Sequence, residues 1–189
     1  NPACYYNFTI GDIDFIMLDC RFYRTNPFKE KRTMLGTVQK EWLKQSLLKS
    51  KGKFKFIVSS VPWSLKAKPG SKDTWAGFEK EREEIFEFIE QNKIEGVILI
   101  SADRHRSDAW KIDRKNSYDF YEFMSSRLTN IHTHKLMPDA LFGYNEKCSF
   151  GLLDINTSDD DPNVVYKTIN LDGEVIDSLT VKSSMLKFK

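Results

Sequence analysis

The sequence predicts an α/β fold built on a parallel sheet. Three short apolar runs, at 14–19, 54–59 and 97–101, alternate with two stretches, 36–51 and 78–91, whose apolar residues repeat at helical spacing. Strands that alternate with helices of this length are joined by right-handed crossovers into a parallel sheet. We therefore expect a β-α-β-α-β unit whose strands all end along one edge of the sheet.

The remaining elements of the first hundred residues follow from turn and helix signals. Asn7 to Ile10 and Asp14 to Asp19 read as two extended stretches joined at Gly11-Asp12, a typical hairpin turn. The first helix ends near Gly52, a residue type that favours helix ends. The apolar helix faces comprise Val38, Trp42, Leu43 and Leu47 in the first helix and Phe78, Ile85, Phe86 and Ile89 in the second.

The end of the chain predicts a second, smaller sheet. Cys148 to Ile155 alternates polar and apolar residues, and Val164 to Ile169 and Val175 to Val181 flank Asp172-Gly173, a hairpin signal. We expect these strands to pack on the first sheet. The chain is then one region, 1–189, in which 1–106 carries the β-α-β-α-β part and 107–189 carries a loop and the strands of the second sheet.

Composition narrows the class of protein. The 29 basic and 27 acidic residues nearly balance, which gives no indication of nucleic-acid binding, and no segment has the apolar length of a transmembrane span. Three scattered cysteines, Cys4, Cys20 and Cys148, are too few for a disulfide framework or a cysteine zinc site. The sequence opens at Asn1 without an initiator Met, so we expect a processed or truncated start.

Chemistry-bearing residues follow the predicted strands. Asp103 and His105 come directly after Val97 to Ser101, and Arg21 follows the first strand of the unit. Ligands of open α/β sheets bind at the carboxyl ends of the strands. An Asp-x-His pair offers a metal one oxygen and one nitrogen, while the planar guanidinium groups of Arg21 and Arg106 suit phosphate. The alternatives are that Asp103 caps the next element, that His105 is a surface histidine and that the arginines pair with neighbouring carboxylates.

Six blocks of residues, in this order and spacing, resemble the second half of the alkaline phosphatase D (PhoD-like) family. They are Tyr6-x-Phe8 with Gly11-Asp12, Phe15 to Arg24, Leu35 to Leu43, Ile57 to Pro62, Trp75 to Arg82, and Ser101 to Arg106. The resemblance implies the C-terminal half of a four-layer αββα metallophosphoesterase sandwich. It further implies a metal-dependent phosphoric ester hydrolase, acting on phosphate mono- or diesters by attack of a metal-activated hydroxide on phosphorus, with bound Fe3+ and Ca2+ and a secreted, periplasmic or cell-surface location.

The resemblance also implies roles for single residues. Asp103 and His105 match the family's metal-ligand motif, usually Ser-Gly-Asp-x-His, in which Ala102 here replaces the glycine. If that position requires a positive φ, the alanine costs stability. Arg21 is the expected catalytic residue and, with Trp75 and Arg106, the expected substrate contact. Core packing is the alternative for Trp75 and an ion pair the alternative for Arg21.

The chain has too few candidate ligands for a two-metal hydrolytic site. His132 and His134 form a second alternating pair, but a substrate-side or structural loop is the favoured interpretation. We expect the missing ligands to come from the N-terminal half of the same protein, so that this chain alone lacks a complete active site. Two alternatives remain: a binding module that keeps the fold without the metals, and a structural subunit of a larger assembly.

Overall fold

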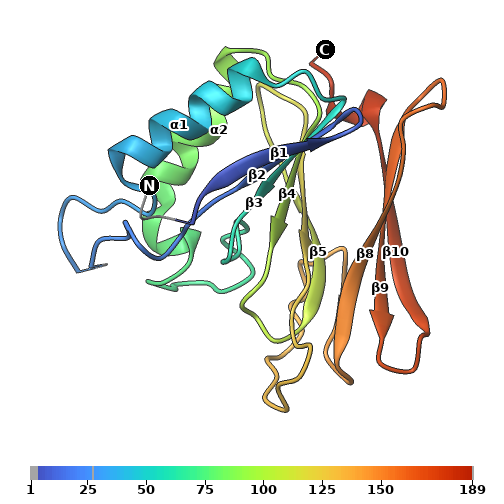
Figure 1. Cartoon of the computed structure of the whole chain (residues 1–189). Helices are drawn as coiled ribbons and strands as arrows, with labels where there is room; N and C mark the ends of the chain where they lie inside the picture. The colour runs from blue at the N-terminus through green and yellow to red at the C-terminus, as the bar shows by residue number, and fades with distance from the viewer. Residues whose placement is uncertain (1–3, 27, 189) are drawn as a thin grey trace.

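The computed structural model describes residues 4–26 and 28–188, which form two sheets and two helices (Figure 1). The predicted truncated or processed start at Asn1 lies outside these residues. The strands and helices are β1 (Tyr6–Ile10), β2 (Ile13–Met17), α1 (Gly36–Lys49), β3 (Phe54–Val58), η1 (Trp75–Phe78), α2 (Glu79–Gln91), β4 (Val97–Ser101), β5 (Ser107–Ile112), β6 (Phe120–Met124), β7 (Phe142–Tyr144), β8 (Ser149–Asn156), β9 (Asn163–Asn170), β10 (Val175–Lys182) and η2 (Ser183–Leu186).

The mixed α/β fold is confirmed. Within the described residues, a seven-stranded sheet has the order β1-β2-β3-β4-β6-β5-β7, and a three-stranded sheet has the order β10-β9-β8. Helices α1 and α2 cover one face of the large sheet, and the small sheet lies on its other side (Figure 1). Strands β2, β3 and β4 run parallel, as the helical crossovers require. In the described part of the chain, α1 and α2 are both too short and too polar to cross a bilayer.

Strands β5, β6 and β7 differ from the expected division at residue 107. The sequence predicted a loop and second-sheet strands after 106, whereas these three strands extend the first sheet, with β6 parallel to β4. All five residues of β6 are buried, including Glu122 at its centre. The charged side chain of Glu122 interrupts the apolar run that would have indicated a strand. The groups that hydrogen-bond to it come from distant parts of the chain and are evident only in the structure.

The small sheet follows its predicted pairing. Strand β9 alternates buried and half-buried residues along its whole length, as expected for a sheet with one face on the core. Its inward-facing Tyr166 stacks on Phe123 of β6, with 4.7 Å between ring centroids, and donates a hydrogen bond to the carbonyl of Met124. The two sheets therefore share one core near β6.

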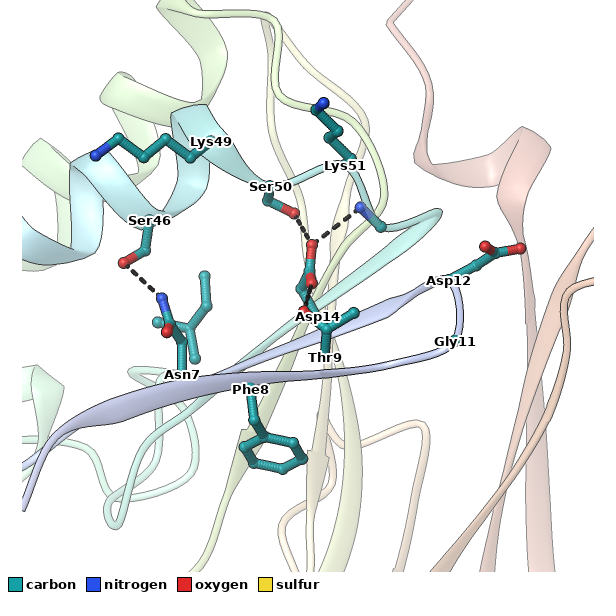
Figure 2. A pocket seen from close by; sticks show the side chains of 12 residues that line it. Asn7, Phe8, Thr9, Gly11, Asp12, Asp14, Ser46, Lys49, Ser50 and Lys51 are labelled. Carbon is teal, nitrogen blue, oxygen red and sulfur yellow. Dashed lines mark hydrogen bonds between the residues drawn. The ribbon is translucent and has the colours of Figure 1, made fainter.

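The β1–β2 hairpin has a polar face toward α1 and an aromatic face on the opposite side. Figure 2 shows Asn7 and Asp14 directed toward the end of α1, and Phe8 directed away from it. Asn7 donates to Ser46, while Asp14 accepts from Thr9, Ser50 and the Gly52 amide. Although partial burial opposes ionisation, these hydrogen bonds hold the pKa of Asp14 below its usual value.

The aromatic face of the hairpin stays largely uncovered in this chain. Phe8 stacks on Phe15, and Phe15 stacks on Phe56, at centroid distances of 4.9 and 5.1 Å. The exposed fractions are 54% for Tyr6, 40% for Phe8 and 59% for Ile10. Three large apolar side chains thus face solvent side by side on an edge strand.

The carboxylate of Glu122 joins three segments beneath the carboxyl edge of the sheet. It accepts hydrogen bonds from the backbone amides of Trp63 and Ser64, at 2.9 and 2.7 Å, and from the hydroxyl of Ser101. Burial raises the pKa of Glu122, and these donors oppose the rise. Strand β6, the end of β4 and the segment after β3 are therefore fixed to one buried group.

We predict that Glu122→Ala in the full-length protein lowers the free energy of unfolding by at least about 3 kcal/mol, because two buried amides and a hydroxyl lose their acceptor at about 1–3 kcal/mol each. Urea denaturation followed by tryptophan fluorescence measures the change. Glu122→Gln keeps one acceptor oxygen and should lose less. A loss below about 1 kcal/mol in the alanine variant would contradict this account of Glu122.

Candidate metal and phosphate site

The carboxyl ends of the parallel strands form the predicted edge. Asp19 and Arg21 follow β2, Ser59 and Ser60 follow β3, and Asp103 follows β4. A shallow hollow of about 330 Å³ lies along this edge. It is lined by Met17, Leu18, Val58, Ser59, Ser60, Ile100, Ser101, Ala102 and Ser125.

The backbone of the ligand motif turns sharply at the two candidate ligands. Asp103 has a φ of 78° and His105 a φ of 46°, whereas Ala102 is not among the non-glycine residues with positive φ in the described chain. The alanine therefore carries no left-handed strain. The left-handed region costs a non-glycine residue about 1–2 kcal/mol, although Asp and His enter it more often than most. Both residues lie in the turn directly after β4.

Three histidines meet at this turn. The ring centroids lie 5.5 Å apart for His105 and His132, 5.3 Å for His105 and His134, and 4.8 Å for His132 and His134. One ligand atom from each ring lies within 4.8 Å of the others, and within the described residues no other group of three or more His, Cys, Asp or Glu meets this criterion. Asp103 is not part of the group. The alternation His132-x-His134 is the one signal for this cluster in the sequence, where a substrate-side or structural loop is the favoured interpretation.

Burial affects the His105 and His134 rings of this cluster in different ways. The Nδ1 atom of His105 is buried and has no hydrogen-bond partner in the structure. Desolvation and the neighbouring Arg104, His132 and His105 lower the pKa of His134, against a hydrogen bond to the Arg104 carbonyl that raises it. A neutral imidazole keeps one nitrogen lone pair available to a ligand or a proton.

Arg21 reaches solvent beside the same edge. The Asp19 carboxylate accepts hydrogen bonds from the backbone amides of Arg21 and Phe22, at 2.8 and 2.9 Å, and so fixes the turn after β2. Partial burial raises the pKa of the Asp19 carboxyl. The hydrogen bonds from backbone amides lower it by more, so the pKa lies below its usual value. Within the described residues, the guanidinium of Arg21 forms no hydrogen bond or ion pair, in contrast to the ion pair considered from sequence.

Trp75 lies in the core rather than at the surface. Its side chain is fully buried, stacks on Trp63 with 4.3 Å between centroids, and donates to the Ser59 hydroxyl at 3.0 Å. Ser59 in turn donates to the carbonyl of Val61. This placement differs from the predicted substrate contact and matches the packing alternative. An indole that is buried in the core near β3 contributes more to the free energy of unfolding than one exposed to solvent at the sheet edge would.

Arg106 is also buried. Its Nε lies 2.7 Å from the carboxylate of Asp108, its Nη2 donates to the carbonyl of Ala67, and the two charged side chains are 1% and 0% exposed. Burial raises the pKa of Asp108, which the Arg106 charge opposes. This position differs from the substrate contact predicted for Arg106, because the buried guanidinium does not face the solvent, where a phosphate would bind.

Comparisons with known proteins identify the family. The sequence model described as PhoD-like phosphatase matches residues 1–173, which is most of the chain. The chain belongs to the PhoD-like phosphatase family. This assignment supports a phosphoesterase-type hydrolase, and it agrees with the motifs that end β2, β3 and β4.

The aligned regions make up a larger share of this chain than of each relative. Alkaline phosphatase D of Bacillus subtilis (strain 168) is 28% identical over 123 residues, which span 54% of this chain and 21% of that protein. A structure of PhoD superposes with a TM-score of 0.68 at 20% identity, over 94% of this chain and 40% of that one. The anchor GAP50 of the inner membrane complex of Plasmodium superposes with a TM-score of 0.58 at 16% identity, over 100% and 56%. The two structures show a shared fold.

We predict that Arg106→Ala in the full-length protein lowers the free energy of unfolding by about 3–5 kcal/mol, because Asp108 is left as an uncompensated buried charge. Chemical denaturation measures the loss. The double variant Arg106→Met, Asp108→Leu removes both charges and should recover much of the stability. An Arg106→Ala variant of unchanged stability with a raised KM would restore the substrate role.

Proposed function

We propose that the full-length protein is a metal-dependent phosphoric ester hydrolase, an alkaline phosphatase or phosphodiesterase of the PhoD-like type. The observation that carries the proposal is the turn after β4, where Asp103 and the unpartnered, buried Nδ1 of His105 stand at the carboxyl edge of the sheet. Family membership supports hydrolysis of a phosphate ester. The alternative, a binding module without a complete metal site, has no observation that favours it over the hydrolase.

The residues of this turn fit a cation. A buried imidazole nitrogen without a partner costs free energy that a bound cation offsets, and the carboxylate of Asp103 adds a charged oxygen. We assign Asp103 and His105 as ligands, with Fe3+ and Ca2+ as the ions that the family resemblance favours. When bound, such ions supply Lewis acidity, which polarises a phosphoryl oxygen and makes water a nucleophile at neutral pH.

Arg21 is the proposed catalytic and substrate-binding residue of this chain. Its guanidinium is exposed at the strand edge and free of protein partners in the described residues, so both donors of its planar fork can face a phosphate. A fixed positive charge there stabilises the negative charge that develops on phosphoryl oxygens in the transition state. The Asp19 turn holds the Arg21 backbone in place.

Further ligands are proposed to come from the N-terminal half of the same protein. The chain spans 21% of the length of the curated relative and 40% of the PhoD structure. The uncovered aromatic face of β1, with Tyr6, Phe8 and Ile10, is the kind of surface that another layer of polypeptide buries. The proposed whole is secreted, periplasmic or at the cell surface, as the family resemblance implies.

We predict that Asp103→Asn and His105→Ala each reduce bound metal and lower kcat/KM by at least about 100-fold in the full-length protein, because each removes a first ligand of the cation. Hydrolysis of p-nitrophenyl phosphate and bis(p-nitrophenyl) phosphate, with elemental analysis, provides the measurement. Asp160→Asn, on an exposed turn, is the matched control. Near wild-type activity in either ligand variant would refute the assignment, and a wild-type protein that holds no metal and hydrolyses neither ester would favour the binding module.

For Arg21→Lys, we expect KM for the same esters to rise about tenfold while the metal content stays constant, because an ammonium cannot form the bidentate contact. Arg24→Lys serves as the control, since Arg24 donates to the carbonyl of Asp73 and not to the edge. Unchanged KM and kcat in Arg21→Lys would remove Arg21 from the site.

A further inference from the structure

We infer that His132 and His134 join His105 in a three-imidazole site for a first-row divalent transition metal. One ligand nitrogen of each ring lies within 4.8 Å of the others, close to a shared point at the carboxyl edge of the sheet. The inference concerns metal binding by these three side chains, and it holds whether or not the protein hydrolyses phosphate esters.

The tautomer of His134 prepares it as a ligand. Its Nδ1 lies 2.8 Å from the carbonyl oxygen of Arg104, so the proton resides on Nδ1 and the lone pair on Nε2. A ligating histidine usually donates its other ring N–H to such a carbonyl, which fixes the ring and raises its basicity. The structure thus contains the second partner that a metal-bound imidazole needs.

The loop that carries His132 and His134 is anchored to the motif that carries His105. The Thr133 hydroxyl donates to the carbonyl of His105 at 3.0 Å, and Asn145 donates to the carbonyl of His134 at 2.8 Å. The backbone amide of His132 donates to Asn130. Much of the ordering that binding would otherwise require is therefore already present in the fold.

The spacing allows closure on an ion. Zinc–nitrogen bonds of about 2.0–2.1 Å place tetrahedral ligand nitrogens about 3.3 Å apart, so the ligand nitrogens must approach one another by at most about 1.5 Å. His132 is exposed and can rotate, whereas His105 and His134 are half-buried. The move is a side-chain adjustment on a loop whose backbone is held.

The donor set selects the class of metal. Imidazole nitrogens suit zinc, copper, nickel and iron, while calcium and magnesium require oxygen ligands. Three neutral imidazoles leave the charge of the ion uncompensated and a coordination position open. An anion would complete such a site.

A cobalt titration of the full-length protein, stripped of metal with a chelator, tests the site. Cobalt replaces zinc at imidazole sites and reports its coordination through visible absorption. We expect the wild-type spectrum to show a cobalt band that zinc displaces. His132→Ala and His134→Ala should each weaken the corresponding affinity by at least about tenfold, and the double variant should lose the band.

Two further variants serve as controls. His132→Cys replaces one zinc ligand by another and should bind cobalt and zinc more tightly than His132→Ala. Thr129→Ala, an exposed residue on the same loop, should have no effect. Zinc should raise the thermal midpoint of the wild type and leave that of the double variant unchanged. A cooperative thermal transition of the double variant in the same experiment shows that it folds. A cobalt band that is unchanged in the His132→Ala, His134→Ala and double variants would overturn the inference, while loss of hydrolysis alone would not affect it.

Discussion

The buried carboxylate of Glu122 links β6, the end of β4 and the segment after β3 at the carboxyl edge of the sheet. A charge at the centre of a buried strand is tolerated only when each of its oxygens is hydrogen-bonded, and here the donors come from Trp63, Ser64 and Ser101. Arg82 adds a nearby positive charge and also donates to the carbonyl of Trp63. Because Ser101 is the last residue of β4, the same group that fixes the sheet fixes the base of the turn with Asp103 and His105.

Elements defined by local patterns could be predicted from the sequence. The hairpin at Gly11-Asp12, the parallel strands β2 to β4 and the alternating strands of the small sheet depend on turn residues and on apolar periodicity, which neighbouring residues determine. Strands β5 and β6 could not be predicted in this way. Asp108 and Glu122 make their patterns look polar, and their partners Arg106 and Ser101 become visible only after folding.

The candidate site shows the same division. Topology placed Asp103, His105 and Arg21 at one edge, because parallel strands end together. Burial of Trp75 and Arg106 depends on contacts across the core that no local pattern encodes. The approach of His132 and His134 to His105 depends on a loop held by backbone carbonyls roughly 28–30 positions away, such as the bond from Thr133 to His105. Spacing along the chain gives no measure of such a contact.

The left-handed turn at Asp103 and His105 sets conformational stability against the proposed ligand role at the same two positions. Glycine adopts these conformations without a Cβ clash and would relieve part of the strain there. Selection for thermal stability alone would therefore favour glycine at both positions. The resulting variant would lack the carboxylate and the imidazole at this edge of the sheet.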